Sequence, residues 1–226
     1  LDWSWANPAI PTVTKLTDST ARITSDSNGV TYIRALFDSV YTDSIRVTVD
    51  QKFAKFRLST PGNPTGAAVS FASLTDTIMV TATAMDANNQ DFRPGVTTPP
   101  PAPTFVASNS GVVNVNAAGR VRADANGDGA IIANVAGVPK SDSLRFNVLQ
   151  VANSILISGV RTDTIASIGA TTTKSVTVLD AKNQGFVTKA LEQITWLSRN
   201  QSKFEVNTAN PVLLTARDTG SAYLVA

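Results

Sequence analysis

Short runs in which every second residue is apolar occur along the whole chain and predict β-strands. In 45–49, Ile45, Val47 and Val49 alternate with Arg46 and Thr48. Residues 78–84 alternate in the same way, which is typical of a strand with one buried face. Turn-forming residues separate such runs at intervals of about 8 to 12 residues, and no run of useful length has helical periodicity. The pattern predicts an all-β protein.

The runs themselves repeat with a period of roughly 95 residues, which indicates an array of similar modules. Each copy has an aromatic residue four positions before an Asn, and later a Gly-x-x-x-Ile/Leu-x-Ala string. The aromatic residues are Trp3, Phe105 and Trp196, and the strings are 29–35, 127–133 and 220–226. We therefore predict tandem immunoglobulin-like β-sandwiches, one complete and two partial.

The repeat also predicts the module boundaries. Residues 1–50 form a partial module without its first strands, 51–150 form the complete module, and 151–226 form a module without its last strand. Strand 220–226 then lacks the neighbour that 44–49 and 143–148 supply in the other copies. Either the chain continues in both directions, which we favour, or neighbouring subunits donate the missing strands.

Several strings in the repeat resemble those of one known family. They are Asp-Ala-x-Asn at 86–89 and 180–183, Gly-Arg-Val-Arg-Ala at 119–123, and the Gly-x-x-x-Ile-x-Ala strings. Together they resemble the bacterial immunoglobulin-like domains of group 2, found in intimin- and invasin-like surface proteins. The chain departs from that pattern at Asn89 and Asn183, where the family often has Gly. The resemblance implies extracellular bacterial or phage proteins that use such modules as spacers and adhesive stalks.

Composition leaves little material for catalysis. The chain has no His and no Cys, so a Ser-His pair, a thiolate nucleophile and an ordinary zinc site are excluded. Glu192 and Glu205 could form a glycosidase-like carboxylate pair, but their polar surroundings favour solvated surface. We expect a protein that is not an enzyme, with no catalytic residues and no cofactor.

The charge pattern bears on partners. The net charge is +2, and the basic residues are scattered singly instead of forming a stripe among aromatics. A nucleic-acid partner is therefore not expected. No apolar run reaches the ~18 residues that span a bilayer, so no transmembrane segment is expected in this stretch.

Residues 124–129 copy the start of a calcium loop, Asp-x-Asn-x-Asp-Gly. Such a loop needs a bidentate carboxylate at its twelfth position, and that position is Val135. Gly127 also aligns with Gly29 and Gly220 of the other copies. We therefore expect a hairpin turn and no metal site.

The repeated aromatics could stack on sugars, but their equivalent positions on a predicted central strand favour core packing. Trp5 has small residues as counterparts and is expected to fill space left by missing strands. The Pro-rich loop 93–103 is the best candidate for contact with a partner, although a tolerated insertion explains it slightly better. Asn200 begins an Asn-x-Ser glycosylation acceptor, and this is a weak prediction.

These observations predict a non-catalytic structural and adhesive repeat region of an extracellular bacterial surface or fibre protein, located outside the cell or on its surface. Its partners would be neighbouring immunoglobulin-like modules of the same or another chain, with a surface glycan or a protein receptor as candidate target. Two alternatives stay open: a phage virion tail or decoration module, and an accessory region of a secreted carbohydrate-active enzyme.

Overall fold

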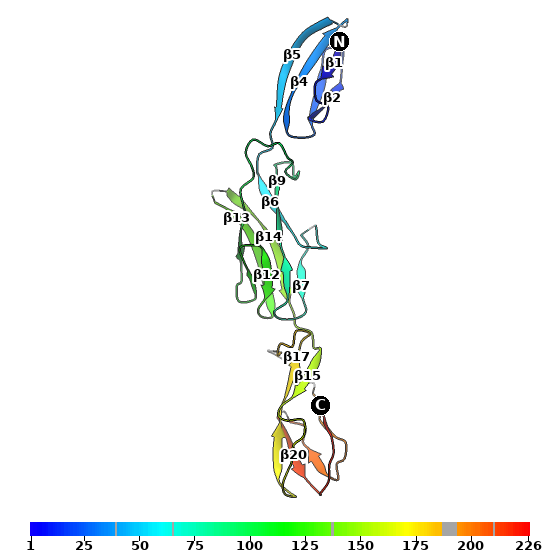
Figure 1. Ribbon diagram of the computed structural model, residues 1–226, viewed down its shortest axis with the longest axis vertical. Coiled ribbons are helices and arrows are strands. Elements are labelled where there is room, and N and C mark those ends of the chain that lie inside the picture. Colours follow the sequence, from blue (N-terminus) through cyan, green and yellow to red (C-terminus); the bar gives the residue numbers. More distant parts are fainter. Residues whose placement is uncertain (39, 65, 137, 187–193, 210) are drawn as a thin grey trace. The chain divides into compact units, whose positions relative to one another are not determined.

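The computed structural model describes residues 1–38, 40–64, 66–136, 138–186, 194–209 and 211–226. This part of the chain is all-β: strands are joined by turns and bends, and the described residues contain no helix. The strands assemble as immunoglobulin-like β-sandwiches (Figure 1). The predicted fold class is therefore confirmed.

The chain divides into two compact units. The first unit comprises Leu1–Ala67, Val80–Val106 and Ile132–Leu144, and the second comprises Ala68–Met79, Ala107–Ile131 and Arg145–Ala226. Residues 51–150 contribute strands to both units. The module boundaries at 50 and 150 remain predictions.

The first unit contains antiparallel strands that follow the predicted alternation. One sheet has the order β1-β4-β5, and β2 pairs with β3 and β6 with β9. The bounds are β1 Asp2–Trp5, β2 Pro11–Lys15, β3 Ala21–Ser25, β4 Gly29–Phe37, β5 Val40–Val49, β6 Lys55–Ser59 and β9 Thr81–Met85.

The second unit has the sheet orders β11-β12-β8, β15-β17, β16-β20-β19 and β18-β21. A further sheet has the order β10-β13-β14-β7, and its strands β10, β13 and β14 have residues in both units. The bounds are β7 Val69–Phe71, β8 Thr77–Met79, β10 Thr104–Ala107, β11 Val113–Val115, β12 Arg120–Ala123, β13 Gly127–Val135, β14 Val138–Val148, β15 Ser154–Ile157, β16 Thr171–Lys174, β17 Val176–Leu179, β18 Leu197–Ser198, β19 Phe204–Val206, β20 Val212–Ala216 and β21 Leu224–Val225.

Alternate residues of these strands form the core, as the period-2 pattern requires. In the second unit, Val121 and Ala123 of β12 and Phe146 and Val148 of β14 are buried. The Phe146 ring stacks on Phe71 of β7, with centroids 5.7 Å apart. A separate buried cluster in the same unit contains Val176, Trp196, Val212 and Leu214.

The glycine that begins each Gly-x-x-x-Ile/Leu-x-Ala string has the same backbone conformation in all three copies. Gly29, Gly127 and Gly220 have φ of 142°, 137° and 131°. Only glycine adopts this region readily. A Cβ at Gly29 would also lie 2.7 Å from the Ile10 side chain, so the repeat requires glycine on two counts.

The left-handed turn residue of the Asp-Ala-x-Asn strings is Asn89 in one copy and Asn183 in the other, with φ of 61° and 59°. Asn tolerates this conformation better than other side chains do. The left-handed turn is therefore formed in both strings without a glycine.

Candidate functional site

Each candidate motif has a defined place in the structure. The calcium-like string forms a bend and the start of β13, and its oxygens bind different protein groups. It connects β12 to a strand of another sheet, so the expected hairpin turn was wrong. Asp124 accepts a hydrogen bond from Arg122 at 2.6 Å, and Asp128 accepts one from Asn147 at 2.8 Å. Asn126 binds Gln150. The three side chains therefore do not converge, and among the described residues no cluster of acidic side chains is placed to hold a metal ion.

The aromatic residues occupy two environments. Trp196 is buried in its cluster, whereas Trp3 and Phe105 are half-buried. The expectation of a central strand was wrong for all three aromatics. Trp3 and Phe105 lie on β1 and β10, which are the end strands of their sheets, and Trp196 lies just before β18, outside the strand. The longer strands β4 and β13 take the inner positions, since each pairs on both sides.

Trp5 lies on β1 opposite Ile33, two pairs along from Trp3. Its indole N–H and those of Trp3 and Trp196 are buried without a hydrogen-bond partner in the described part of the chain. Buried indole N–H groups usually find a partner, so these three are exceptions to that rule.

The remaining candidates lie on the surface or outside the described residues. Glu205 is exposed and pairs with Arg217, whereas Glu192 lies outside the described residues, so the carboxylate pair stays untested. Asn200 is exposed, and its side chain accepts hydrogen bonds from the N–H and hydroxyl of Ser202 at 3.1 and 2.7 Å.

The Pro-rich loop led to a site that the sequence analysis missed. Arg93, at its start, donates its backbone N–H to the side chain of Gln51 at 2.8 Å and its guanidinium to the carbonyl of Asp26. Thr97 donates its N–H and hydroxyl to Asp50 at 2.8 and 2.5 Å. The first part of the loop is thus bound to residues 26–51 of its own unit.

At the centre of these contacts lies a network that we call the first clamp: Asn28, Gln51 and Asp86. Asn28 and Gln51 exchange two hydrogen bonds, from Asn28 Nδ2 to Gln51 Oε1 at 2.9 Å and from the Gln51 N–H to Asn28 Oδ1 at 2.8 Å. Gln51 Nε2 then donates to Asp86 at 3.0 Å and to the carbonyl of Asp91 at 3.2 Å. The first clamp therefore joins the turn before β4, the segment after β5 and the turn after β9.

The second unit contains the same network at the counterpart positions, and we call it the second clamp: Asn126, Gln150 and Asp180. The exchanged pair between Asn126 and Gln150 measures 2.9 and 2.8 Å. Gln150 Nε2 donates to Asp180 at 3.0 Å and to the carbonyl of Gly185 at 3.3 Å. Two copies of the repeat thus contain the same hydrogen-bond network.

The clamps hold their carboxylates in the charged form. The side chain of Gln51 and then the backbone N–H of Gln90 lower the pKa of Asp86. Asp180 is fully buried, and burial alone would raise its pKa. Hydrogen bonds from the Gln150 side chain and three backbone N–H groups outweigh that effect, so the pKa of Asp180 is lowered from 3.8.

The repeat contained a signal for these networks. Asn28 and Asn126 each precede the repeated glycine, Gln51 and Gln150 each follow a repeated valine strand, and the two aspartates head the Asp-Ala-x-Asn strings. A search for polar residues repeated at matching positions would have grouped them. In the third copy Thr219 stands before Gly220, so the Asn of the clamp is not part of every copy.

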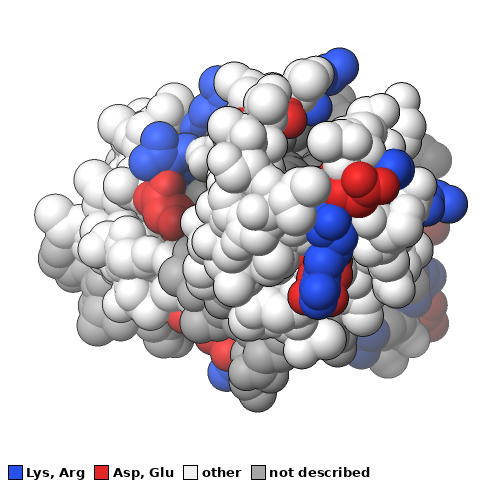
Figure 2. Space-filling model, turned by 90° about the horizontal axis from the view of Figure 1, so that it is seen from below, with Lys and Arg blue, Asp and Glu red and all other residues white. Residues whose placement is uncertain are grey.

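Charged side chains elsewhere are mixed in sign. Figure 2 shows blue and red groups side by side on the face that it displays, without a continuous patch of one sign. Pairs such as Lys203–Asp218 at 2.6 Å and Arg57–Asp91 at 2.9 Å are partly exposed, and pairs of this kind contribute about 0–1 kcal/mol each. No helix in the described part of the chain is long and apolar enough to cross a membrane.

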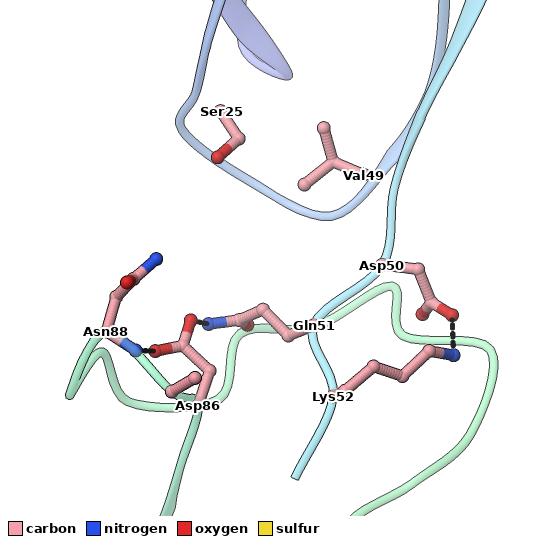
Figure 3. A pocket seen from close by; sticks show the side chains of 8 residues that line it. Ser25, Val49, Asp50, Gln51, Lys52, Asp86 and Asn88 are labelled. Carbon is pink, nitrogen blue, oxygen red and sulfur yellow. Dashed lines mark hydrogen bonds and ion pairs between the residues drawn. The ribbon is translucent and has the colours of Figure 1, made fainter. Parts of the chain in front are cut away.

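A hollow of about 230 Å³ lies beside the first clamp (Figure 3). Ser25 and Val49 line one side of it, and Gln51, Lys52 and Asp86 line the other. The hydrogen bond from Gln51 to Asp86 and the Lys52–Asp50 ion pair both join residues that line the hollow (Figure 3).

No protein-family model and no curated protein sequence matches the chain. Among solved structures, domains 1–6 of the surface layer protein SbsC are similar, with TM-score 0.37, 17% identity and coverage of 99% of this chain and 32% of that chain. Invasin, described as a bacterial integrin-binding protein, has TM-score 0.37 and 15% identity over 91% of this chain and 43% of its own. A β-glucuronidase of glycoside hydrolase family 2 has TM-score 0.31 and 14% identity over 60% of this chain and 16% of its own.

The chain thus spans about a third of the SbsC structure. At these identities and TM-scores the likeness assigns no family and no function.

Proposed function

We propose that this chain is a non-catalytic structural and adhesive repeat region of an extracellular bacterial surface or fibre protein. We further propose that its modules are of the bacterial immunoglobulin-like group 2 type. Their task is to hold successive sandwiches together, either along one chain or between chains. The adhesive target would be a surface glycan or a protein receptor.

The observation that supports this proposal most strongly is the repetition of the clamp. Asn28, Gln51 and Asp86 bind one another with the same donors and acceptors as Asn126, Gln150 and Asp180. A network whose Gln side chain is satisfied at both ends stabilises one local arrangement, because an altered arrangement leaves partly buried polar groups unpaired. A module whose role is structural needs such a device where its linker leaves the sandwich.

The role of the first clamp can be tested with spin labels. The chain has no cysteine, so Ser19→Cys and Thr81→Cys, both exposed positions of the first unit, label specifically. Pulsed electron spin resonance then measures the distribution of distances between the labels. We expect a narrow distribution that broadens on Gln51→Ala and stays narrow on the control Gln90→Ala, whose side chain is exposed.

A distribution that is broad before any substitution, or that Gln51→Ala leaves unchanged, would contradict the structural role of the clamp.

A further inference from the structure

One segment of the second unit, Ala68–Met79, adds a strand to each of two sheets. Its strand β7 pairs in parallel with β14 along Phe146–Val148. Its strand β8 pairs in antiparallel fashion with β12 along Arg120–Arg122. A single stretch of about a dozen residues therefore closes both sheets on one side.

The turn between β7 and β8 seats this segment against the second clamp. The N–H of Leu74 donates to the Asp180 carboxylate at 2.8 Å, and the N–H of Thr75 donates to the carbonyl of Ala123 at 2.8 Å. The N–H of Val151 donates to the carbonyl of Ala72 at 2.8 Å. The Leu74 side chain is buried. The second clamp is thus a docking point for the turn as well as a junction.

The first unit contains counterparts of the two strands, β14 and β12, with which this segment pairs. Strand β5 matches β14 and β3 matches β12, and each is the end strand of its sheet in the described part of the chain. The edge of β5 at 47–49 and the edge of β3 at 22–24 are the counterparts of the edges that β7 and β8 occupy. An unpaired strand edge presents N–H and C=O groups to any segment able to pair with them.

The positions that the Ala68–Met79 segment covers differ in exposure from their counterparts in the first unit. Val121, which pairs with Ile78 of the segment, is 0% exposed, whereas its counterpart Ile23 is 45% exposed. Phe146, which pairs with Val69, is buried, whereas its counterpart Val47 is half-buried. The apolar positions that the segment covers are therefore more open at the edges of β3 and β5.

The hollow beside the first clamp lies where the turn would sit. Its lining residues Ser25, Val49, Lys52 and Asp86 are the counterparts of Ala123, Val148, Val151 and Asp180. Each of those four counterparts pairs with or hydrogen-bonds to the Ala68–Met79 segment. In Figure 3 the Asp86 carboxylate faces the Gln51 amide at the edge of this hollow.

We propose that the hollow and the edges of β3 and β5 form an acceptor site for a polypeptide segment of the Ala68–Met79 type, supplied by a further repeat of this kind. The bound segment would pair with 47–49 through its first strand and with 22–24 through its second. Its turn would place an apolar side chain in the hollow and donate a backbone N–H to Asp86. This site goes beyond the proposed structural role of the clamp, because it names a surface and the segment that occupies it.

The test uses the whole chain and a fluorescent peptide with the sequence of residues 68–79. Fluorescence anisotropy should show saturable binding. Ile23→Asp should weaken this binding by roughly tenfold or more, because the docked segment would bury an unpaired charge. The matched control is Ile168→Asp, which changes an isoleucine that is 63% exposed elsewhere in the chain and should leave the binding unchanged.

A peptide carrying Leu74→Asp should bind weakly, since its turn would place a second carboxylate beside Asp86. Because Ile23 is exposed, Ile23→Asp should keep the melting temperature of the parent chain, and Ile23→Lys is the second variant if the first does not fold. Absence of peptide binding, or binding that neither variant weakens, would overturn the proposal. So would self-association of the chain that Ile23→Asp abolishes, because a second copy would then be the occupant. None of these results depends on Gln51, so failure here is distinct from failure of the proposed function.

Discussion

Asp180 shows at the scale of one residue how the fold keeps a buried carboxylate charged. Its Oδ1 accepts the N–H groups of Lys182 and Gln184 at 2.8 and 3.0 Å. Its Oδ2 accepts the N–H of Leu74 and the amide of Gln150 at 2.8 and 3.0 Å. Four donors offset the cost of burial, which explains why the pKa of Asp180 is lowered and not raised.

Stability should therefore depend on Asp180 below about pH 5. Because its pKa is lower in the folded protein than in the unfolded chain, the unfolded chain binds the proton more readily. The stabilisation is complete above the ordinary pKa of about 3.9 and is lost as the pH falls through the folded value. Asp180→Asn should flatten this acid-side decline and cost about 1–3 kcal/mol at neutral pH.

Urea unfolding at a series of pH values measures both effects. The exposed Asp128→Asn is the control. An acid-side slope in Asp180→Asn equal to that of the parent chain would refute this account.

At the scale of the element, the position of a strand in its sheet decides how much its aromatic residue contributes. Phe146 lies on β14, which has a neighbour on each side, and it is buried against Phe71. Phe105 lies on the end strand β10 and is half-buried. The two phenylalanines of one sandwich therefore differ in burial, although both lie on strands with alternating apolar and polar residues.

Alanine substitution of these two residues should lower the stability of the protein by different amounts. We expect Phe146→Ala to lower the free energy of unfolding by about 3–5 kcal/mol and Phe105→Ala by clearly less, because the cavity and the lost contacts scale with burial. Chemical denaturation followed by far-ultraviolet circular dichroism measures both losses. Equal losses would show that the edge position of β10 does not matter.

At the scale of the whole molecule, the two clamps share no residue and lie in different units. Sites without shared partners usually act independently. Gln51→Ala should therefore increase amide hydrogen exchange at residue 51 and leave exchange at Gln150 unchanged, and Gln150→Ala should do the reverse. Exchange that changes at both positions in either variant would reveal coupling that the hydrogen bonds do not account for.

The sequence predicted the features that depend on local rules. Alternation predicted the strands, and the repeat aligned Gly29, Gly127 and Gly220, which share a positive φ. The order of strands in a sheet was missed for β1 and β10, because pairing joins segments far apart along the chain. The clamps were missed for the same reason: Asn28 and Gln51 are separated by 23 positions, and Gln51 and Asp86 by 35. Each of these polar residues alone resembles ordinary solvated surface.

The division of a clamp among three segments has an evolutionary consequence. In residues 51–150 the Asp lies at the head of a turn in the interior, the Asn lies further along before the glycine, and a Gln stands at each end. A duplicated or shuffled unit that keeps these residues keeps its share of the clamp on each side. Gene rearrangement can then lengthen, shorten or reorder such an array without inventing a new interface, and a copy with Thr219 in place of the Asn marks where that interchangeability stops.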